Sequence, residues 1–341
     1  ADTYGCGQER VYKPFSLFSE THPDSKVKII NPGESTAYAE FANYDYVILQ
    51  RPKFNKQIDF IKSFKANPNL RNTKIIVEYD DDLFHVDQFN VSYKFYKHGS
   101  QDLRNIKQAL RLSDGVLVST PELEKEYQQY TDKPIGYAIN FVNSQEKFYT
   151  NPDFHMRHKL PPDKVVLMWS GSTSHASSIL FFAGVMQTVL LQNKNAVFAF
   201  CGNKEYLDLL KTPKEQTIFI NPTKPEDFNN VPSCADICLA PMPLSPFNDC
   251  KSELRMLQYG IFGIPAIASP VAPYVRFNNV SGSVLLPKKN RIDKWVKLCN
   301  ELIQNEELRK KNGELAKQAV LQHYTAAISN QQRVDFFLSL K

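Results

Sequence analysis

The stretch DICLAPMPLSPFNDCKSELRMLQYGIFGIPAIAS, residues 236–269, decides the fold. Its apolar run at 237–240 predicts a buried strand, and a Pro-rich loop follows as far as Cys250. We predict that a helix opens at about Lys251 and that a second apolar strand covers 265–268. This order of strand, loop, helix and strand is typical of a parallel sheet in an α/β protein.

The predicted helix start would suit an anion. The first turn of a helix carries unpaired N–H groups and the positive end of the helix dipole, and both attract negative charge. Lys251 and Ser252 would add a cation and a hydroxyl, as binding of a diphosphate requires. Ordinary capping of the helix is the alternative interpretation.

The rest of the chain alternates short apolar runs with helical patterns. This alternation predicts parallel sheets that helices cover on both faces. Residues 140–160 lose the periodicity, and we interpret them as a linker. The predicted strands are 26–30, 46–50, 74–79, 115–119, 135–138, 165–169, 196–201, 217–220 and 283–286, and the last three predicted helices are 291–304, 306–323 and 327–340.

Length and composition indicate two globular domains. A chain of 341 residues exceeds the needs of one ordinary core, and 42% hydrophobic with 23% charged residues is a globular composition. No apolar run is long enough for a membrane span, and we find no secretion signal. The six cysteines show no metal-site spacing, so we expect a cytoplasmic protein. The net charge of +5 arises in residues 161–341, which suits an anionic ligand without implying nucleic acid.

Three carboxylates, Asp80, Asp81 and Asp82, follow the predicted strand 74–79 directly. They therefore lie at the carboxyl end of the sheet, where open α/β folds bind ligands. One interpretation is a GT-A glycosyltransferase, which holds a divalent metal on a DxD motif, although the second α/β half argues against it. Another is structural, with the aspartates capping the turn toward Phe84. His85 either lines the same pocket or is an ordinary surface histidine.

Two segments resemble glycosyltransferase family 4 and its phage and bacterial relatives. Residues 247–269 resemble the nucleotide-sugar motif FNxxKSxLKxLEYxxxGIPxIAS, and 169–175 resemble the turn GWxGSxxH. The segment EYDDDLF at 78–84 is similar to a recurrent form in these relatives. The residues that match the first motif are Phe247, Asn248, Lys251, Ser252, Leu254, Arg255, Leu257, Tyr259, Gly263, Ile264, Pro265, Ile267, Ala268 and Ser269.

The resemblance implies a GT-B fold, with two Rossmann-like, doubly wound domains that face each other across a cleft. Residues 1–157 would form the acceptor-side domain and 158–323 the nucleotide-sugar-binding domain, while 324–341 would form a helix that packs back on the first domain. The implied activity moves a sugar from a nucleotide-diphosphate sugar to an acceptor hydroxyl, with retention. No metal and no other cofactor is expected.

The resemblance also implies roles for single residues. Asp81, or Asp80 as the alternate, would orient the acceptor hydroxyl or stabilise oxocarbenium-like charge. Gly5 and Gly7 would bracket a tight turn beside the donor diphosphate, and Gly202 and Asn203 would lie along the nucleotide. An ordinary turn is the alternative interpretation at both places. The remaining expected donor contacts are Gly171, Ser172, Ser174, His175, Asn248, Lys251, Ser252 and Gln258.

Two departures from the family pattern bear on the donor site. The paired glutamates of the family fall at Cys250 and Gln258, and only Gln258 can still hydrogen-bond a ribose hydroxyl. The family often places Arg and Lys just beyond the turn 169–175, where this chain has Ser and Ala. Neutralisation of the diphosphate would therefore fall more heavily on Lys251.

The acceptor remains open between a carbohydrate and another hydroxyl compound. One alternative function is a glycosyltransferase that acts on modified bases in phage-type DNA, which requires basic and aromatic surface around the cleft. Another is a nucleotide-binding GT-B protein without turnover, which the missing glutamates permit.

Overall fold

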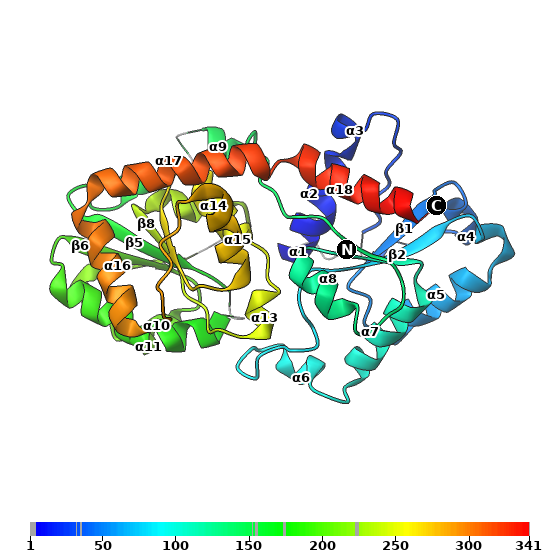
Figure 1. Cartoon of the computed structure of the whole chain (residues 1–341), viewed down its shortest axis with the longest axis horizontal. Helices are drawn as coiled ribbons and strands as arrows, with labels where there is room; N and C mark the ends of the chain where they lie inside the picture. The colour runs from blue at the N-terminus through cyan, green and yellow to red at the C-terminus, as the bar shows by residue number, and fades with distance from the viewer. Residues whose placement is uncertain are drawn as a thin grey trace.

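The computed structural model describes residues 5–31, 33–34, 36–151, 153, 156–172, 175–221 and 225–340. Two parallel sheets lie side by side, and helices cover each of them (Figure 1). This confirms the predicted α/β class with two Rossmann-like halves. The one-sheet GT-A architecture is excluded.

The first sheet has four parallel strands in the order β1-β2-β3-β4. Its two central strands are buried on both faces, because apolar runs such as IIV in β2 and VLV in β3 leave no polar side to solvate. Helices α5 (Asn55–Ala66), α7 (Gln101–Leu112) and α8 (Pro121–Tyr127) cover one face. The strands are β1 (Tyr46–Gln50), β2 (Lys74–Tyr79), β3 (Gly115–Val118) and β4 (Ile135–Tyr137).

The second sheet has five parallel strands in the order β7-β6-β5-β8-β9. The chain runs outward from β5 to one edge and then returns to β8, so the strand order reverses beside β5. In open α/β sheets the crevice at such a reversal is where ligands bind. The strands are β5 (Val165–Ser170), β6 (Ala196–Cys201), β7 (Thr217–Ile220), β8 (Ile237–Ala240) and β9 (Ala266–Ala268).

Helices cover both faces of this second sheet. One face packs on α10 (Ala176–Gln192) and α16 (Ile292–Gln304), around the buried side chains of Phe182 and Trp295. The other face packs on α14 (Leu254–Gly260), α15 (Ala272–Ser281) and α17 (Glu306–His323).

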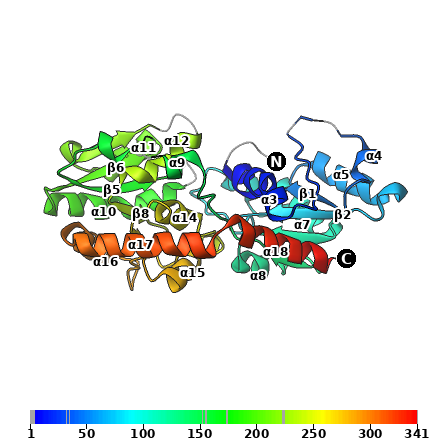
Figure 2. The same cartoon turned by 90° about the horizontal axis from the view of Figure 1, so that it is seen from above.

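The last helix, α18 (Ala326–Ser339), leaves the second sheet and packs on the first, as Figure 2 shows. Thr325 caps it by accepting a hydrogen bond from the N–H of Ile328. Phe336 lies so close to Gly136 of β4 that a Cβ on this glycine would come within 2.4 Å of the ring. Glycine is therefore what allows the helix to approach the sheet.

Three local predictions are wrong. Gly5 and Gly7 do not bracket a turn, because α1 (Gly5–Gly7) is helical and continues through a π-helical turn to Tyr12. Residues 26–30 form no strand; together with the free edge of β1 they line a cavity of about 880 Å³. Residues 283–286 contribute a single β-bridge, between Leu285 and Ile267, rather than a strand.

Over the part of the chain that the structure describes, no helix combines the length and the apolarity that crossing a membrane requires.

Candidate active site

The carboxyl ends of both sheets point toward one region between the halves, and side chains from both meet there. Asp81 follows β2 of the first sheet, and Lys251 lies in the loop after β8 of the second. Lys251 Nζ lies 3.1 Å from Asp81 Oδ1. A cation from one half thus contacts a carboxylate from the other.

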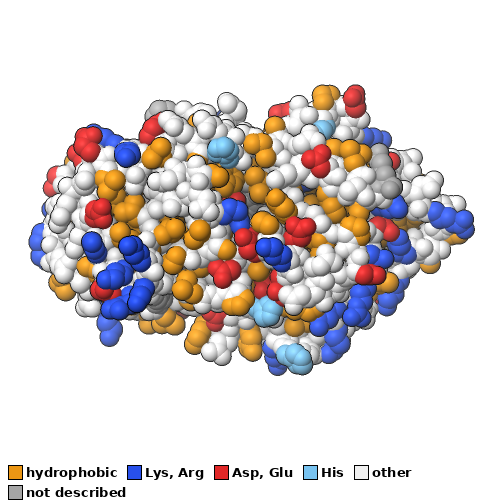
Figure 3. All heavy atoms as spheres, viewed as in Figure 1, with side chains coloured by type: hydrophobic (Ala, Val, Ile, Leu, Met, Phe, Trp, Pro, Cys, Tyr) orange, Lys and Arg blue, Asp and Glu red, His pale blue; other side chains and the backbone are white. Residues whose placement is uncertain are grey.

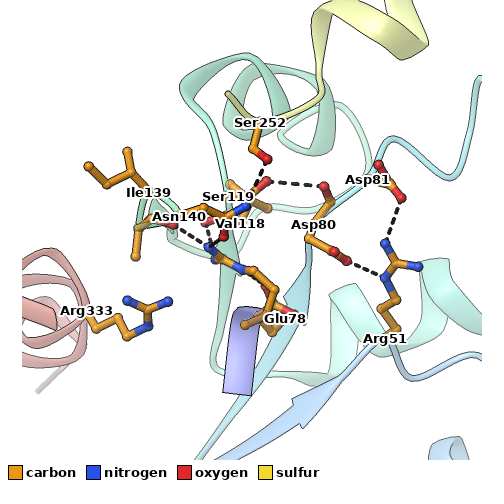
Figure 4. A network of polar contacts seen from close by, with 12 residues as sticks. Arg51, Glu78, Asp80, Asp81, Val118, Ser119, Ile139, Asn140, Ser252 and Arg333 are labelled. Carbon is orange, nitrogen blue, oxygen red and sulfur yellow. Dashed lines mark hydrogen bonds and ion pairs between the residues drawn. The ribbon is translucent and has the colours of Figure 1, made fainter. Parts of the chain in front are cut away.

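Arg51 holds the two aspartates from below, as Figure 4 shows. It follows β1 directly, and its guanidinium donates to a carboxylate oxygen of Asp80 and, over 2.7 Å, to Oδ2 of Asp81. Burial would raise the pKa of Asp81, but Lys251 and Arg51 outweigh it and lower that pKa to about 2. Asp81 is therefore ionised at neutral pH.

Asp82 has a different role from its neighbours. Its carboxylate is buried and accepts hydrogen bonds from the backbone N–H groups of Phe84 and His85, at 3.0 and 3.2 Å, while His85 Nδ1 lies 2.8 Å away. The structural interpretation, a capped turn toward Phe84, thus holds for Asp82 but not for Asp81. Asp82, His85 and Glu126 also offer ligand atoms within 4.8 Å of one another, so these three residues could hold a metal ion.

Ser252 faces the first half through Asn140, whose Nδ2 donates to the serine hydroxyl over 2.8 Å. The other end of that amide accepts from Arg10, which is buried and ion-paired to Glu78 at 2.6 Å. In Figure 4, Ser252, Asn140 and Glu78 are labelled along this chain of contacts. The serine hydroxyl is therefore oriented by a buried network of the first half.

The helix start differs from the prediction. A short helix α13 (Pro246–Asp249) comes first, and α14 begins only at Leu254, after Glu253. Lys251 and Ser252 thus precede the helix. They therefore offer their side chains to the region between the halves, and not the N–H groups of the first turn of α14.

Asn248 has a hydrogen-bond partner within its own loop. Its side chain is buried, and Nδ2 donates to the carbonyl of Pro243 over 2.8 Å. Its role in the structure is to close the loop that carries Lys251.

The turn after β5 brings Gly171 and His175 to the same region. A Cβ on Gly171 would lie 2.6 Å from the ring of Trp169, so only glycine fits. His175 precedes α10, and burial together with Arg255 and Lys251 keeps the pKa of its imidazole well below the usual value. Ser172 lies in the turn between them, and its carbonyl accepts from the N–H of His175, whereas Ser174 lies outside the described residues.

Arg255 is a second cation that the second half brings to the site, besides Lys251. It projects from α14 to the turn after β5, where its guanidinium donates to the carbonyl of Ser170 and lies 3.4 Å from His175 Nε2. It also stacks 5.9 Å over the ring of Trp169. Arg255 therefore lies beside the turn where the family pattern led us to expect Arg and Lys.

The two positions of the missing glutamates differ in surroundings. Cys250 is buried against the core of the first half, burial raises the pKa of its thiol to about 12, and its carbonyl accepts from Thr120 Oγ1. Gln258 is half-buried, and its Nε2 donates to Asn229 Oδ1 over 3.2 Å. Cys250 therefore joins the halves and offers no polar group to a ribose.

The glycines of the two turns pack against each other. A Cβ on Gly202 would lie 2.8 Å from the carbonyl oxygen of Gly171 and 2.9 Å from Trp169. Gly202 therefore acts in packing the two turns. Gly5 and Gly7 flank Cys6, which is half-buried, and desolvation together with the negative charge of Asp80 raises the pKa of its thiol.

Sequence reasoning missed Arg51, and Arg255 entered only as a motif match. Arg51 had a signal, because it follows a predicted strand just as the aspartates do, and the carboxyl ends of neighbouring parallel strands lie together. Its φ of 45°, uncommon for a non-glycine residue, turns it toward the aspartates.

Comparison with known proteins gives a fold but no family. No family model matches the sequence, and neither does any curated protein. Solved structures do match. TarM is 15% identical, with 86% of this chain and 54% of TarM covered and a TM-score of 0.63. HepE from Anabaena in complex with UDP-glucose is 13% identical, with 89% of this chain and 80% of HepE covered and a TM-score of 0.64.

WaaG, a glycosyltransferase involved in lipopolysaccharide biosynthesis, is 10% identical, with 98% and 97% of the two chains covered and a TM-score of 0.63. The chain spans about half the length of TarM. These neighbours are GT-B glycosyltransferases, so this chain has the GT-B fold.

Proposed function

We propose that this protein is a glycosyltransferase that moves a sugar from a nucleotide-diphosphate sugar to an acceptor hydroxyl. The contact of 3.1 Å between Lys251 and Asp81 carries the proposal. It brings a lysine that can bind a phosphate together with an ionised carboxylate, at the place where the halves of a GT-B fold meet. Structures of the neighbour HepE with UDP and with UDP-glucose favour UDP as the nucleotide.

The proposed roles follow from charge. Lys251 and Arg255 neutralise the departing diphosphate, with the Ser252 hydroxyl as a hydrogen-bond donor. Asp81 lies on the acceptor side, where it orients the attacking hydroxyl or stabilises positive charge at the anomeric carbon. Arg51 is a positioning residue, because it holds Asp81 and keeps it ionised.

Retention and independence of metal belong to the same proposal. Retention rests on the resemblance to family 4. Two cationic side chains beside the diphosphate can supply the charge that a metal ion supplies elsewhere. We place the protein in the cytoplasm, because its six cysteines are free, as a reducing compartment requires.

Thermal unfolding with a panel of UDP-, GDP-, ADP- and CDP-sugars tests the donor site. A ligand at about 100 times its Kd should stabilise the protein by about 2.7 kcal/mol. The protein should then cleave the nucleotide sugar that stabilises it and release the nucleoside diphosphate. Lys251→Ala should abolish this release. Equal release by the wild type and by Lys251→Ala would overturn the assignment of this residue.

Cys250 favours a second candidate, a nucleotide-binding GT-B protein without turnover. Its side chain occupies the position of a family glutamate and is buried against the first half. This candidate predicts that a nucleotide sugar stabilises the protein but is neither hydrolysed nor transferred to any of a panel of sugar acceptors. That result would favour it over a glycosyltransferase.

A further inference from the structure

An arm with exposed apolar side chains follows the loop that carries the three aspartates of the first half. It covers residues 86–100 and includes the short helix α6 (Tyr93–Tyr96). Four large apolar side chains within it face solvent, with exposed fractions of 56% for Phe89, 53% for Val91, 40% for Tyr93 and 47% for Phe95. Exposed apolar groups gathered in this way mark an interaction surface.

The arm is a built structure. Val86 and Tyr96 are buried and anchor its two ends. Between them successive turns are closed by backbone hydrogen bonds, from Asn90 to Asp87 and from Tyr93 to Asn90, each 2.9 Å long. These bonds hold the arm in a conformation in which its apolar side chains face outward.

A lysine joins the arm to the beginning of α5. Lys53 Nζ lies 5.2 Å from the ring centre of Phe54, 5.4 Å from that of Phe95 and 5.0 Å from that of Tyr96. Phe54, the residue before α5, is 58% exposed. Its ring and that of Phe95 therefore form one exposed apolar patch around a cation.

Further cations surround this patch. Lys94 Nζ lies 5.0 Å over the ring of Phe95, and the guanidinium of Arg104, in the first turn of α7, donates to the carbonyl of Gly99 in the arm. Lys56, in the first turn of α5, and Lys97, which follows α6, are also exposed. The acidic side chains nearby are Asp59, Asp87 and Asp102, the last of which lies 3.7 Å from Lys53. Figure 3 shows Lys and Arg side chains gathered at the lower right, over α5 and α7.

We propose that the arm and the adjoining ends of α5 and α7 dock on an anionic lipid bilayer. Aromatic side chains settle at the level of the lipid headgroups, and lysines and arginines beside them pair with anionic headgroups. Single Phe rings and an aliphatic Val91 that project from the surface fit this partner. Nucleic-acid surfaces instead use a basic groove in which bases stack, and the cores of protein interfaces are depleted of lysine.

Docking would place the acceptor side near the lipid. The arm begins four residues after Asp82, so a bilayer against it lies beside the loop that carries Asp81. An acceptor hydroxyl on a lipid-linked compound would then reach this carboxylate; this consequence, unlike the docking itself, rests on the proposed function.

Flotation with lipid vesicles tests the docking without any nucleotide sugar. The protein should float with vesicles of phosphatidylcholine and phosphatidylglycerol, less with phosphatidylcholine alone, and less again at high salt. The double variant Phe89→Ser, Phe95→Ser should bind roughly tenfold more weakly. Lys94→Glu with Lys97→Glu should lose the preference for phosphatidylglycerol.

The control variant is Leu209→Ser with Leu321→Ser, two side chains of the second half with exposed fractions of 49% and 44%. It should bind vesicles as the wild type does, and circular dichroism should show that all variants are folded. No flotation by the wild type, equal loss by the control and arm variants, or binding of a single-stranded oligonucleotide but not of vesicles would overturn the proposal.

Discussion

Asp81→Asn should strengthen the binding of UDP while it abolishes sugar transfer. Without a donor, Asp81 accepts a hydrogen bond from Lys251 at 3.1 Å. A diphosphate must draw Lys251 away from this carboxylate and also approaches its negative charge. Asparagine has the same shape but no charge, so the repulsion disappears and the hydrogen bond that Lys251 must give up is weaker.

The size of the effect follows from the pKa of Asp81, which is lowered from 3.8 to about 2. One pKa unit corresponds to about 1.36 kcal/mol. Lys251 and Arg51 share this stabilisation, and the Lys251 and Asp81 side chains are 21% and 25% exposed, so solvent screens part of it. About 1 kcal/mol remains for Lys251, which corresponds to roughly fivefold tighter binding.

Isothermal titration of UDP into five proteins, the wild type, Lys251→Ala, Asp81→Asn, the double variant and a control, measures the effect. Lys251→Ala should weaken binding about tenfold or more, because it removes a charge-assisted hydrogen bond to phosphate. Asp81→Asn should have a smaller effect in that background than in the wild type. Asp114→Asn, which removes a surface partner of Lys65, is the matched control. Unchanged or weaker binding of UDP by Asp81→Asn would refute the reasoning.

Three further predictions concern stability. Gly202→Ala should lower the free energy of unfolding by about 1–3 kcal/mol in chemical denaturation, since its methyl group would meet a carbonyl oxygen at 2.8 Å. Gly5→Ala, whose methyl group would meet nothing within 4 Å, should lower it less, and equal losses would contradict this. Gly136→Ala should lower Tm by displacing α18, and adding Phe336→Ala should recover part of the loss, because that ring is the obstacle; strictly additive losses would count against it. The folded-state pKa of Asp81 is depressed, so its ion pairs stabilise the protein fully above about pH 4 and are lost as the pH falls toward 2. Asp81→Asn should therefore make the free energy of unfolding depend less steeply on pH in this range, and an unchanged slope would argue against the pairing.

The two sheets could be predicted because their strands are continuous apolar runs. Residues 74–79 and 196–201 are buried almost throughout, and few other structures accommodate such runs at this spacing. The segment 26–30, which reads KVKII, is also rich in β-branched residues yet forms no strand. A strand needs a hydrogen-bonded neighbour as well as an apolar sequence, and composition does not reveal the neighbour.

The site could be predicted only in part. That carboxylates end β2 is visible in the sequence, but which of them faces the second half is decided by Lys251, which is distant in the chain. Asp82 turns instead to the backbone of its own loop. The start of α14 shifted for a similar reason, because Glu253 is buried and paired at 2.9 Å with Arg276.

A crystal structure with bound UDP tests the central claim most directly. The account predicts a diphosphate within hydrogen-bonding distance of Lys251 Nζ, with the Lys251–Asp81 contact broken and Asp81 still held by Arg51. A diphosphate bound elsewhere, with the contact between Lys251 and Asp81 intact, would contradict it.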